Sequence, residues 1–260
     1  MKVFWMLIAV ILWVMAPVYM ISANTLATEI STDVKVPVIF YAYHLKPPLI
    51  VDVSSKQGIY YDFTRLLSKR STRYEFRTKF LPRKRIDHLL KLQQISGGLI
   101  GVNPLWFGDK QESKYLWGPA ILKDRDELVS LSKHPFEYNG PASLLGERVG
   151  GVLGYYYFGI DELVNQNKAY RINTNGERAI LFMLLSGRVR AGIVSRSTYE
   201  YLVPRESWQG KFHLSAKPHD VFERRVMFPH SQQDIHQEVV NLMGNPANDN
   251  EWQSILKGYQ

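Results

Sequence analysis

At 260 residues, the chain is long enough for one large or two small domains, and its composition, 45% hydrophobic and 13% aromatic, is typical of a globular protein. The absence of cysteine from the sequence excludes disulfide bonds, thiol nucleophiles, cysteine-ligated zinc and a lipid-modified cysteine. The net charge of +8 is scattered along the chain apart from the run at 83–85, which indicates a solvated surface, and we expect no nucleic-acid partner.

The first residues have the pattern of a secretory signal peptide. Met1-Lys2 is followed by an apolar run at 3–15, and small residues follow around Ala23 and Ala27. We therefore expect residues 1–27 to be a signal peptide, cleaved after residue 23 or 27, and the mature protein to lie in the periplasm. Because the apolar character continues to Ile21, an uncleaved membrane anchor is the alternative.

In chain order, hydrophobic periodicity predicts strands that alternate with helices. The expected strands are at residues 36–41, 74–80, 99–102, 127–132, 148–152, 170–172, 189–194 and 221–228. The expected helices are at residues 58–70, 85–94, 160–167, 179–185, 195–202, 234–242 and 251–259. Hydroxyls at Ser195, Ser197 and Thr198 can cap the helix that begins there. Segment 134–140 is expected to cross between two parts of the fold.

A helix, a Ser-Gly break and a short buried strand occur twice, at residues 86–102 and 179–194. Each strand leads into a polar turn, at Asn103 and at Ser195. In an open α/β sheet, such turns present backbone N–H groups to a ligand. Two facing turns would form a cleft, although α/β proteins in general repeat helix–glycine–strand units.

Several segments outside the leader keep a recognisable order and spacing. They are KPPL (46–49), GIYYDFTRLLSKR (58–70), SGGLIGVNP (96–104), YLWGPAI (115–121), LLGERVGGVLGYYYFG (144–159) and SGRVRAGIVSRSTYEYL (186–202). In this order they resemble the bacterial extracellular solute-binding proteins of family 3, the periplasmic receptors of polar amino-acid uptake systems. The resemblance covers residues 34 to 260.

The resemblance implies an α/β fold of the periplasmic-binding-protein type with two lobes, each a mixed sheet flanked by helices, joined by a two-strand hinge. Residues 34–132 with 221–260 would form the first lobe, and residues 133–220 the second. The implied partners are a small-molecule solute, held by closure of the cleft, and an inner-membrane permease. We expect a monomer without cofactor or metal.

The sequence departs from the family where amino acids are bound. The family's arginine, which pairs with the ligand carboxylate, falls on Gly108 or Asp109, with Lys110 as the nearest cation. The family's aspartate, which holds the ligand ammonium, falls on Ser195, and its hydroxyl pair falls on Tyr155-Tyr156. An α-amino acid would lose both charged partners, which makes it a poor candidate ligand.

The residues expected to bind the solute are aromatic or can form hydrogen bonds. They are Tyr43, Arg85, Asn103, Trp106, Phe107, Tyr155, Tyr156, Tyr157, Ser195 and Arg196. Aromatic walls bind flat or apolar ligands by burial and stacking, and Arg196 could supply the cation that the first lobe lacks. Trp117 and Phe158 are expected to pack within the lobes instead. The acids at 124, 126 and 127 are expected to be surface charges.

The motifs favour binding over catalysis. The seven histidines lie singly, which disfavours a metal site, and no Gly-x-Ser-x-Gly elbow is present. A phosphate-binding turn at Gly154 stays open. We expect a non-catalytic receptor. The alternatives are an enzyme of the cyclohexadienyl dehydratase type, with Asp109 as the nearest candidate acid, and a periplasmic sensory or adaptor protein. A single undivided core, or a gap between lobes plugged by the chain's own side chains, would contradict the two-lobed receptor.

Overall fold

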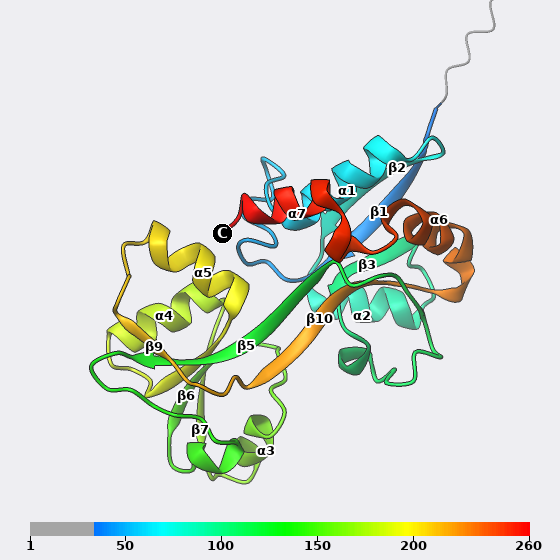
Figure 1. Ribbon diagram of the computed structural model, residues 1–260. Coiled ribbons are helices and arrows are strands. Elements are labelled where there is room, and N and C mark those ends of the chain that lie inside the picture. Colours follow the sequence, from blue (N-terminus) through cyan, green and yellow to red (C-terminus); the bar gives the residue numbers. More distant parts are fainter. Residues whose placement is uncertain (1–33) are drawn as a thin grey trace, which may run out of the picture. The chain divides into compact units, whose positions relative to one another are not determined.

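Two antiparallel strands, β5 (Leu122–Leu131) and β10 (Asp220–Phe228), connect the two lobes of the protein (Figure 1). The computed structural model describes residues 34–260, so the predicted signal peptide lies outside the described residues. Within the described range, no helix has the length and apolarity that a membrane span requires.

The first lobe is built on a mixed sheet with the order β2-β1-β3-β10, in which only β10 is antiparallel to its neighbour. Its strands are β1 (Val36–Ala42), β2 (Tyr74–Phe80), β3 (Gly97–Val102) and the short β4 (Leu116–Trp117), which pairs with β10. Its helices are α1 (Ile59–Arg70), α2 (Arg83–Lys91), α6 (Gln233–Met243) and α7 (Asn250–Lys257). A short 3-10 helix, Pro104–Phe107, follows β3.

The second lobe continues the same sheet in the order β5-β8-β6-β7. Its strands are β6 (Arg148–Val152), β7 (Tyr170–Thr174), β8 (Ala191–Ser195) and β9 (Phe212–Leu214), which pairs with β5. Its helices are α3 (Ile160–Asn165), α4 (Glu177–Leu185) and α5 (Arg196–Arg205). The two-lobed α/β architecture expected from the sequence is confirmed, while the residue boundaries of the lobes stay a prediction.

Each lobe buries its own apolar side chains. In the first lobe, Phe40 and Phe228 belong to one cluster with Trp252, a fully buried residue of α7 whose ring packs against Phe63 of α1. In the second lobe, Ile180 and Leu184 of α4 pack against the sheet beside Val194. Within residues 34–260, the buried apolar clusters each belong to one lobe, so the chain does not form a single undivided core.

Two expectations about connections are wrong. Segment 134–140 does not cross between lobes, because β5 itself makes the crossing and residues 134–140 form a loop that hydrogen-bonds within the second lobe. Ser195 precedes α5, but its side chain does not cap the helix, since its hydroxyl bonds to Asp126 and Glu177 instead. The short strands β4 and β9 lie in segments predicted to be loops.

Candidate functional site

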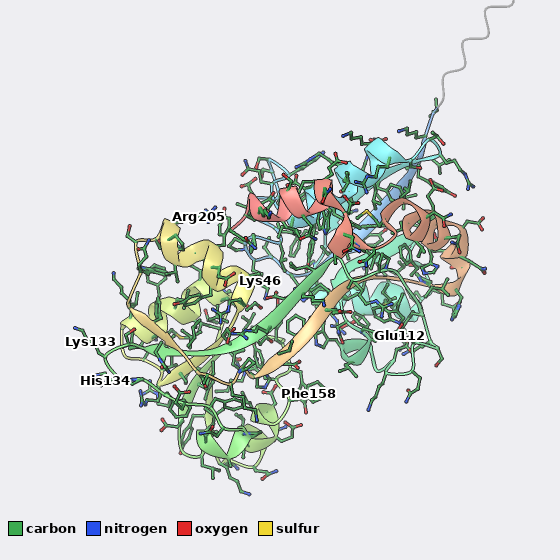
Figure 2. All side chains as sticks on the ribbon, in the orientation of Figure 1. Lys46, Glu112, Lys133, His134, Phe158 and Arg205 are labelled. Atoms are coloured by element: carbon green, nitrogen blue, oxygen red, sulfur yellow. The ribbon has the colours of Figure 1, made fainter. Side chains whose placement is uncertain are left out.

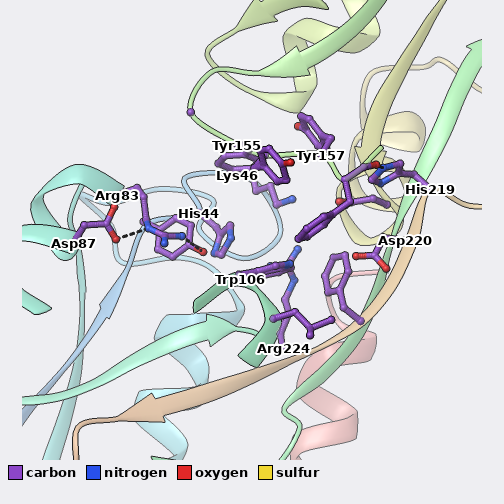
Figure 3. Close-up of a pocket in the computed structure, with 17 residues that line it drawn as sticks. His44, Lys46, Arg83, Asp87, Trp106, Tyr155, Tyr157, His219, Asp220 and Arg224 are labelled. Atoms are coloured by element: carbon purple, nitrogen blue, oxygen red, sulfur yellow. Dashed lines mark hydrogen bonds and ion pairs between the residues drawn. The ribbon is translucent and has the colours of Figure 1, made fainter. Parts of the chain in front are cut away.

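A cavity of about 390 Å³ lies between the two lobes at the ends of several strands (Figure 3). The first lobe contributes the loop after β1, the start of α2 and the 3-10 helix after β3. The second lobe contributes the loop after β6, and β5 and β10 supply the floor. This volume is within the range of small-molecule sites, which are about 300–1,000 Å³.

Aromatic rings form much of the cavity wall. The His44 ring contacts Tyr43, with centroids 4.0 Å apart, and faces Tyr155 at 5.9 Å from the opposite lobe. The Trp106 ring packs edge-on against Phe222, with centroids 4.8 Å apart. Such rings offer a solute large flat surfaces at a low cost in conformational entropy.

Arg224 lies beneath these rings as a buried cation. Its guanidinium is 1% exposed, donates to the Asp124 carboxylate at 3.0 Å, and lies 4.9 Å from the centroid of Phe222. Burial alone would raise the pKa of Asp124, but the positive charges of Arg224 and Lys46 hold it below its ordinary value. The ion pair therefore joins β5 and β10 where the two strands cross between the lobes.

A second charged cluster fills part of the gap between the lobes. The Lys46 ammonium, on the loop after β1, is 2.5 Å from the Glu177 carboxylate and 2.5 Å from the Ser195 hydroxyl. The same hydroxyl is 2.9 Å from the Asp126 carboxylate, whose pKa is raised to about 6 by burial. The chain's own side chains thus occupy one part of the cleft, and the cavity is the part that they leave.

The acids of β5 are not surface charges, contrary to the sequence interpretation. Glu127 is fully buried and pairs with Arg196 at 2.8 Å, while Asp124 and Asp126 face Arg224 and Lys46. Glu127 also pairs with Arg125 on the same strand, but the other partners are far away in the sequence, so the local pattern of β5 does not indicate burial. Charged residues are rarely buried unless they are paired, as these are.

Two cavity histidines each carry a ring nitrogen without a partner. Nδ1 of His44 and Nδ1 of His219 are buried and have no hydrogen-bond partner among the described residues. His219 Nε2 contacts the carbonyl oxygen of Phe158 at 2.9 Å. Because buried polar atoms are normally satisfied, these two nitrogens are available to a polar group of a bound molecule.

Replacing His44 by phenylalanine is expected to make the free energy of unfolding fall less steeply as the pH is lowered. Burial first, and then the nearby cations Arg224, Lys46 and Arg83, hold the pKa of His44 well below 6.5. Below pH 6.5, His44 therefore binds a proton in the unfolded chain but stays neutral in the folded protein. The free energy of unfolding consequently falls as the pH falls. Between pH 7 and 5, urea unfolding should show the original protein losing about 2 kcal/mol relative to His44→Phe. Parallel pH profiles for the two proteins would contradict this.

The structure brings half of the predicted ligand-binding residues to the cavity. Tyr43, Trp106, Tyr155, Tyr156 and Tyr157 line it. Within this group Tyr157 is also a packing residue, since it is buried and its hydroxyl accepts the N–H of Val152 at 3.1 Å. The Tyr156 side chain is 57% exposed and bonds to Glu162 on the rim.

The other predicted residues do not line the cavity. Arg85 is exposed on α2, and Arg83 on the same helix contributes to the wall instead. The Asn103 side chain caps the 3-10 helix that follows β3. Phe107 packs under the Arg83 guanidinium, 4.4 Å from its ring centroid. Ser195 is buried in the Lys46 cluster.

Arg196 does not supply a cation to the cavity. Its guanidinium turns to β5 and α5, where it is 2.8 Å from Glu127 and 3.8 Å from Glu200. Trp117 packs as expected: it is 8% exposed and its indole donates to Asp109 at 2.8 Å. Phe158, in contrast, is 56% exposed and lines the cavity.

Sequence reasoning missed the charged and imidazole groups of the cavity. They are His44, Lys46, Arg83, Asp87, Asp126, His219, Asp220 and Arg224. One signal was present in β10, where Arg224 stands in the same alternating register as Phe222 and Val226, both of which are buried. A charge at a core position of a strand indicates a buried pair or a site.

Asp109, the acid suggested for an enzyme, is a structural carboxylate. It is 3% exposed and accepts the N–H groups of Ser113, Lys114 and Tyr115 as well as the indole N–H of Trp117. These bonds hold its pKa below its ordinary value although burial alone would raise it. Its oxygens are therefore occupied by the loop that it organises, outside the cavity. Residues 34–260 also contain no cluster of side chains suited to a metal ion.

No protein-family model matches the sequence, and no curated protein matches it. Solved structures do. A mutant of ArgBP from T. maritima is 12% identical with a TM-score of 0.65, covering 86% of this chain and 94% of its own. The substrate-binding protein of an amino acid ABC transporter is 12% identical with a TM-score of 0.64, covering 86% and 98%.

The periplasmic VFT2 domain of BvgS from Bordetella pertussis is 17% identical with a TM-score of 0.59, covering 86% of this chain and 93% of its own. Identities this low establish the fold alone. The resemblance predicted from the sequence is confirmed at that level: the chain has the two-lobed α/β fold of the solute-binding proteins of family 3.

Proposed function

We propose that the protein is a non-catalytic periplasmic receptor that binds a small aromatic or polar solute between its lobes and delivers it to an inner-membrane permease. The observation that carries the proposal is the cavity at the facing strand ends, with rings from both lobes around it. A solute there contacts both lobes only when they are closed, so binding stabilises the closed form. The apolar leader at 3–15 supports export to the periplasm.

The walls of the cavity favour a flat solute that is not an α-amino acid. Trp106 and Tyr155 supply apolar faces, and His44 Nδ1 can bond one polar group. The lysine and arginine side chains that line the cavity already have carboxylate partners: Arg224 with Asp124, Lys46 with Glu177, and Arg83 with Asp87. A solute carboxylate would therefore compete with carboxylates of the protein.

A panel of neutral, anionic and cationic aromatic metabolites, screened by melting temperature, tests the proposal. A solute at one hundred times its Kd is expected to raise the Tm by about 5–10 °C, by mass action. Trp106→Ala should weaken binding at least about tenfold, because a stacking surface is lost. Tyr170→Ala, an exposed aromatic residue of β7 outside the cavity, is the matched control and should bind normally. A flat response across the panel would contradict a receptor.

The enzyme alternative now depends on Asp126 rather than Asp109. Asp126 lines the cavity and burial raises its pKa to about 6, a property that catalytic acids share. Its Oδ1 is held by the Ser195 hydroxyl, and Lys46 and Glu177 lie around it, which suits a structural role in the cluster. Turnover of prephenate-like substrates that is lost in Asp126→Asn would favour the enzyme over the receptor.

A further inference from the structure

Lys46 is part of the first lobe, but its ammonium group contacts residues of the second lobe. Figure 2 shows Lys46 beside β5, between the two lobes. The side chain starts from the loop after β1 and reaches Glu177 at the start of α4 and Ser195 at the end of β8. The Lys46 and Glu177 side chains are 6% and 3% exposed. A buried ammonium carries a large desolvation cost unless oxygens replace its water, and here they do.

Hydrogen bonds that do not involve Lys46 orient the oxygens around this ammonium group. Glu177 Oε2 accepts the Ser195 N–H at 3.0 Å, which orients the carboxylate. Glu177 is also the first residue of α4, where the positive end of the helix favours a negative charge. The Ser195 hydroxyl donates to Asp126 at 2.9 Å, which leaves its lone pairs for an N–H donor.

The loop that carries Lys46 is fixed by three further hydrogen bonds. The Lys46 N–H donates to the His44 carbonyl at 3.0 Å, and the Ile50 N–H donates to the Lys46 carbonyl at 2.9 Å. From the second lobe, the Thr198 hydroxyl donates to the Pro47 carbonyl at 2.7 Å. The backbone therefore aims the side chain of Lys46 across the gap.

We propose that Glu177, Ser195 and Asp126 form a binding site for one primary ammonium group, and that Lys46 is the tethered occupant of this site. Two oxygens of the second lobe, one of Glu177 and one of Ser195, accept from the ammonium, and the Asp126 carboxylate of β5 accepts from the same Ser195 hydroxyl and adds negative charge beside it. Because the occupant is part of the same chain, its effective concentration is far above that of a free amine. A free amine is thus excluded from this site while Lys46 is present.

For the proposed receptor, occupation of the ammonium site by Lys46 indicates a solute without an ammonium group. The solute occupies the remaining cavity and needs no ammonium group of its own, since Lys46 already neutralises the acids that would receive one. This consequence rests on the proposed function, whereas the ammonium site does not.

Replacing Lys46 by alanine and adding n-propylammonium tests the site. Alanine lacks the last three side-chain carbons of lysine and its ammonium, and n-propylammonium supplies three carbons and an ammonium, so the free cation is expected to refill the space. The Tm of Lys46→Ala should rise in a saturable way, by about 3–6 °C at ten times the Kd. The original protein should show no such rise. No saturable rise in a folded Lys46→Ala would overturn the proposal.

Three controls separate site binding from general effects of salt or alcohol. 1-Propanol, which has the same chain but no charge, should not stabilise Lys46→Ala. Lys69→Ala, which breaks an ion pair with Glu251 on the surface, should not respond to propylammonium. The double variant Lys46→Ala with Glu177→Gln should lose the response. An equal rise in Tm in any of these three controls would show that propylammonium does not act at the proposed site.

Acetylation of the unaltered chain tests the same site if Lys46→Ala does not fold. Acetic anhydride should modify Lys69, which is 73% exposed, at least about tenfold faster than Lys46, which is 6% exposed and bound. Glu177→Gln should remove this protection. Equal rates for the two lysines in the folded chain would overturn the proposal. Neither measurement uses a solute, so a failed metabolite panel would count against the receptor and leave the ammonium site standing.

Discussion

Arg224→Met is expected to lower the free energy of unfolding by about 3–5 kcal/mol, because it leaves the Asp124 carboxylate buried without its cation. Both side chains are 1% exposed, and the pair lies where β5 and β10 pass between the lobes. Methionine keeps much of the packing against Trp106 and Phe222, so the loss measures the charge rather than a cavity. Urea unfolding at pH 7 gives the value, and solute binding should fall with it.

A neighbouring ion pair on the same two strands provides the matched control. Lys123 and Glu223 are 3.9 Å apart with exposed fractions of 80% and 48%, so Glu223→Gln should change the free energy of unfolding by less than about 1 kcal/mol. The double variant Arg224→Met with Asp124→Asn should regain part of the lost stability, since the unpaired charge is gone. If Arg224→Met costs no more than Glu223→Gln, the buried pair does not secure the hinge.

Local pattern is sufficient for most of the regular elements. It predicts a strand at 148–152, where the structure has β6, and it predicts α1 and β2 within one residue, but it gives only the second half of β5 and misses β4 and β9. The predicted elements are defined by apolar periodicity and by breaks such as Gly58 before α1 and Pro82 after β2, both of which are local. The resemblance of ordered motifs then supplied the two lobes, which no single motif could indicate.

Apart from the register of Arg224 in β10, local pattern does not indicate the charged part of the site. Lys46 contacts residues 131 and 149 positions away, and Arg224 contacts an aspartate 100 positions away. An acidic run before a strand is typical of a surface loop, so the sequence interpretation placed the acids of β5 in solvent, and a lysine before two prolines gives no indication of burial. Only the approach of the two lobes makes Lys46 a neighbour of Glu177 and Ser195, and only the pairing of β5 with β10 makes Arg224 a neighbour of Asp124.

Some of the predicted aromatic residues line the cavity and others do not, and the reason is geometrical. Trp106 and Tyr155 follow the ends of β3 and β6 and point into the gap, as loops after strand ends do in open sheets. Phe107 is one residue beyond Trp106 in the same 3-10 helix, so its ring lies on a different side of that helix and packs under Arg83. Adjacent residues in a helical turn do not share a face.

Asp109→Ala is expected to lower the free energy of unfolding by about 3 kcal/mol and to loosen the loop at 103–119. The carboxylate accepts the N–H groups of Ser113 and Lys114 at 2.9 Å and that of Tyr115 at 3.1 Å, besides the Trp117 indole. Alanine leaves the buried indole N–H of Trp117 and three partly buried backbone N–H groups without their acceptor, which costs more than the bonds themselves contribute. Urea unfolding measures the loss, and hydrogen exchange at residues 113–115 should rise.

Asp52→Ala provides the comparison, because Asp52 also accepts a backbone N–H, that of Ser55, but in an exposed turn. Water can replace that bond, so we expect a loss below about 1 kcal/mol. Asp109→Asn should lie between the two alanine variants, since one amide oxygen replaces two carboxylate oxygens. A catalytic Asp109 would behave in the opposite way: the asparagine variant would keep full stability and lose turnover. A carboxylate whose oxygens are held by four N–H donors cannot pass a proton to a substrate without releasing the loop, so we expect the stability loss instead.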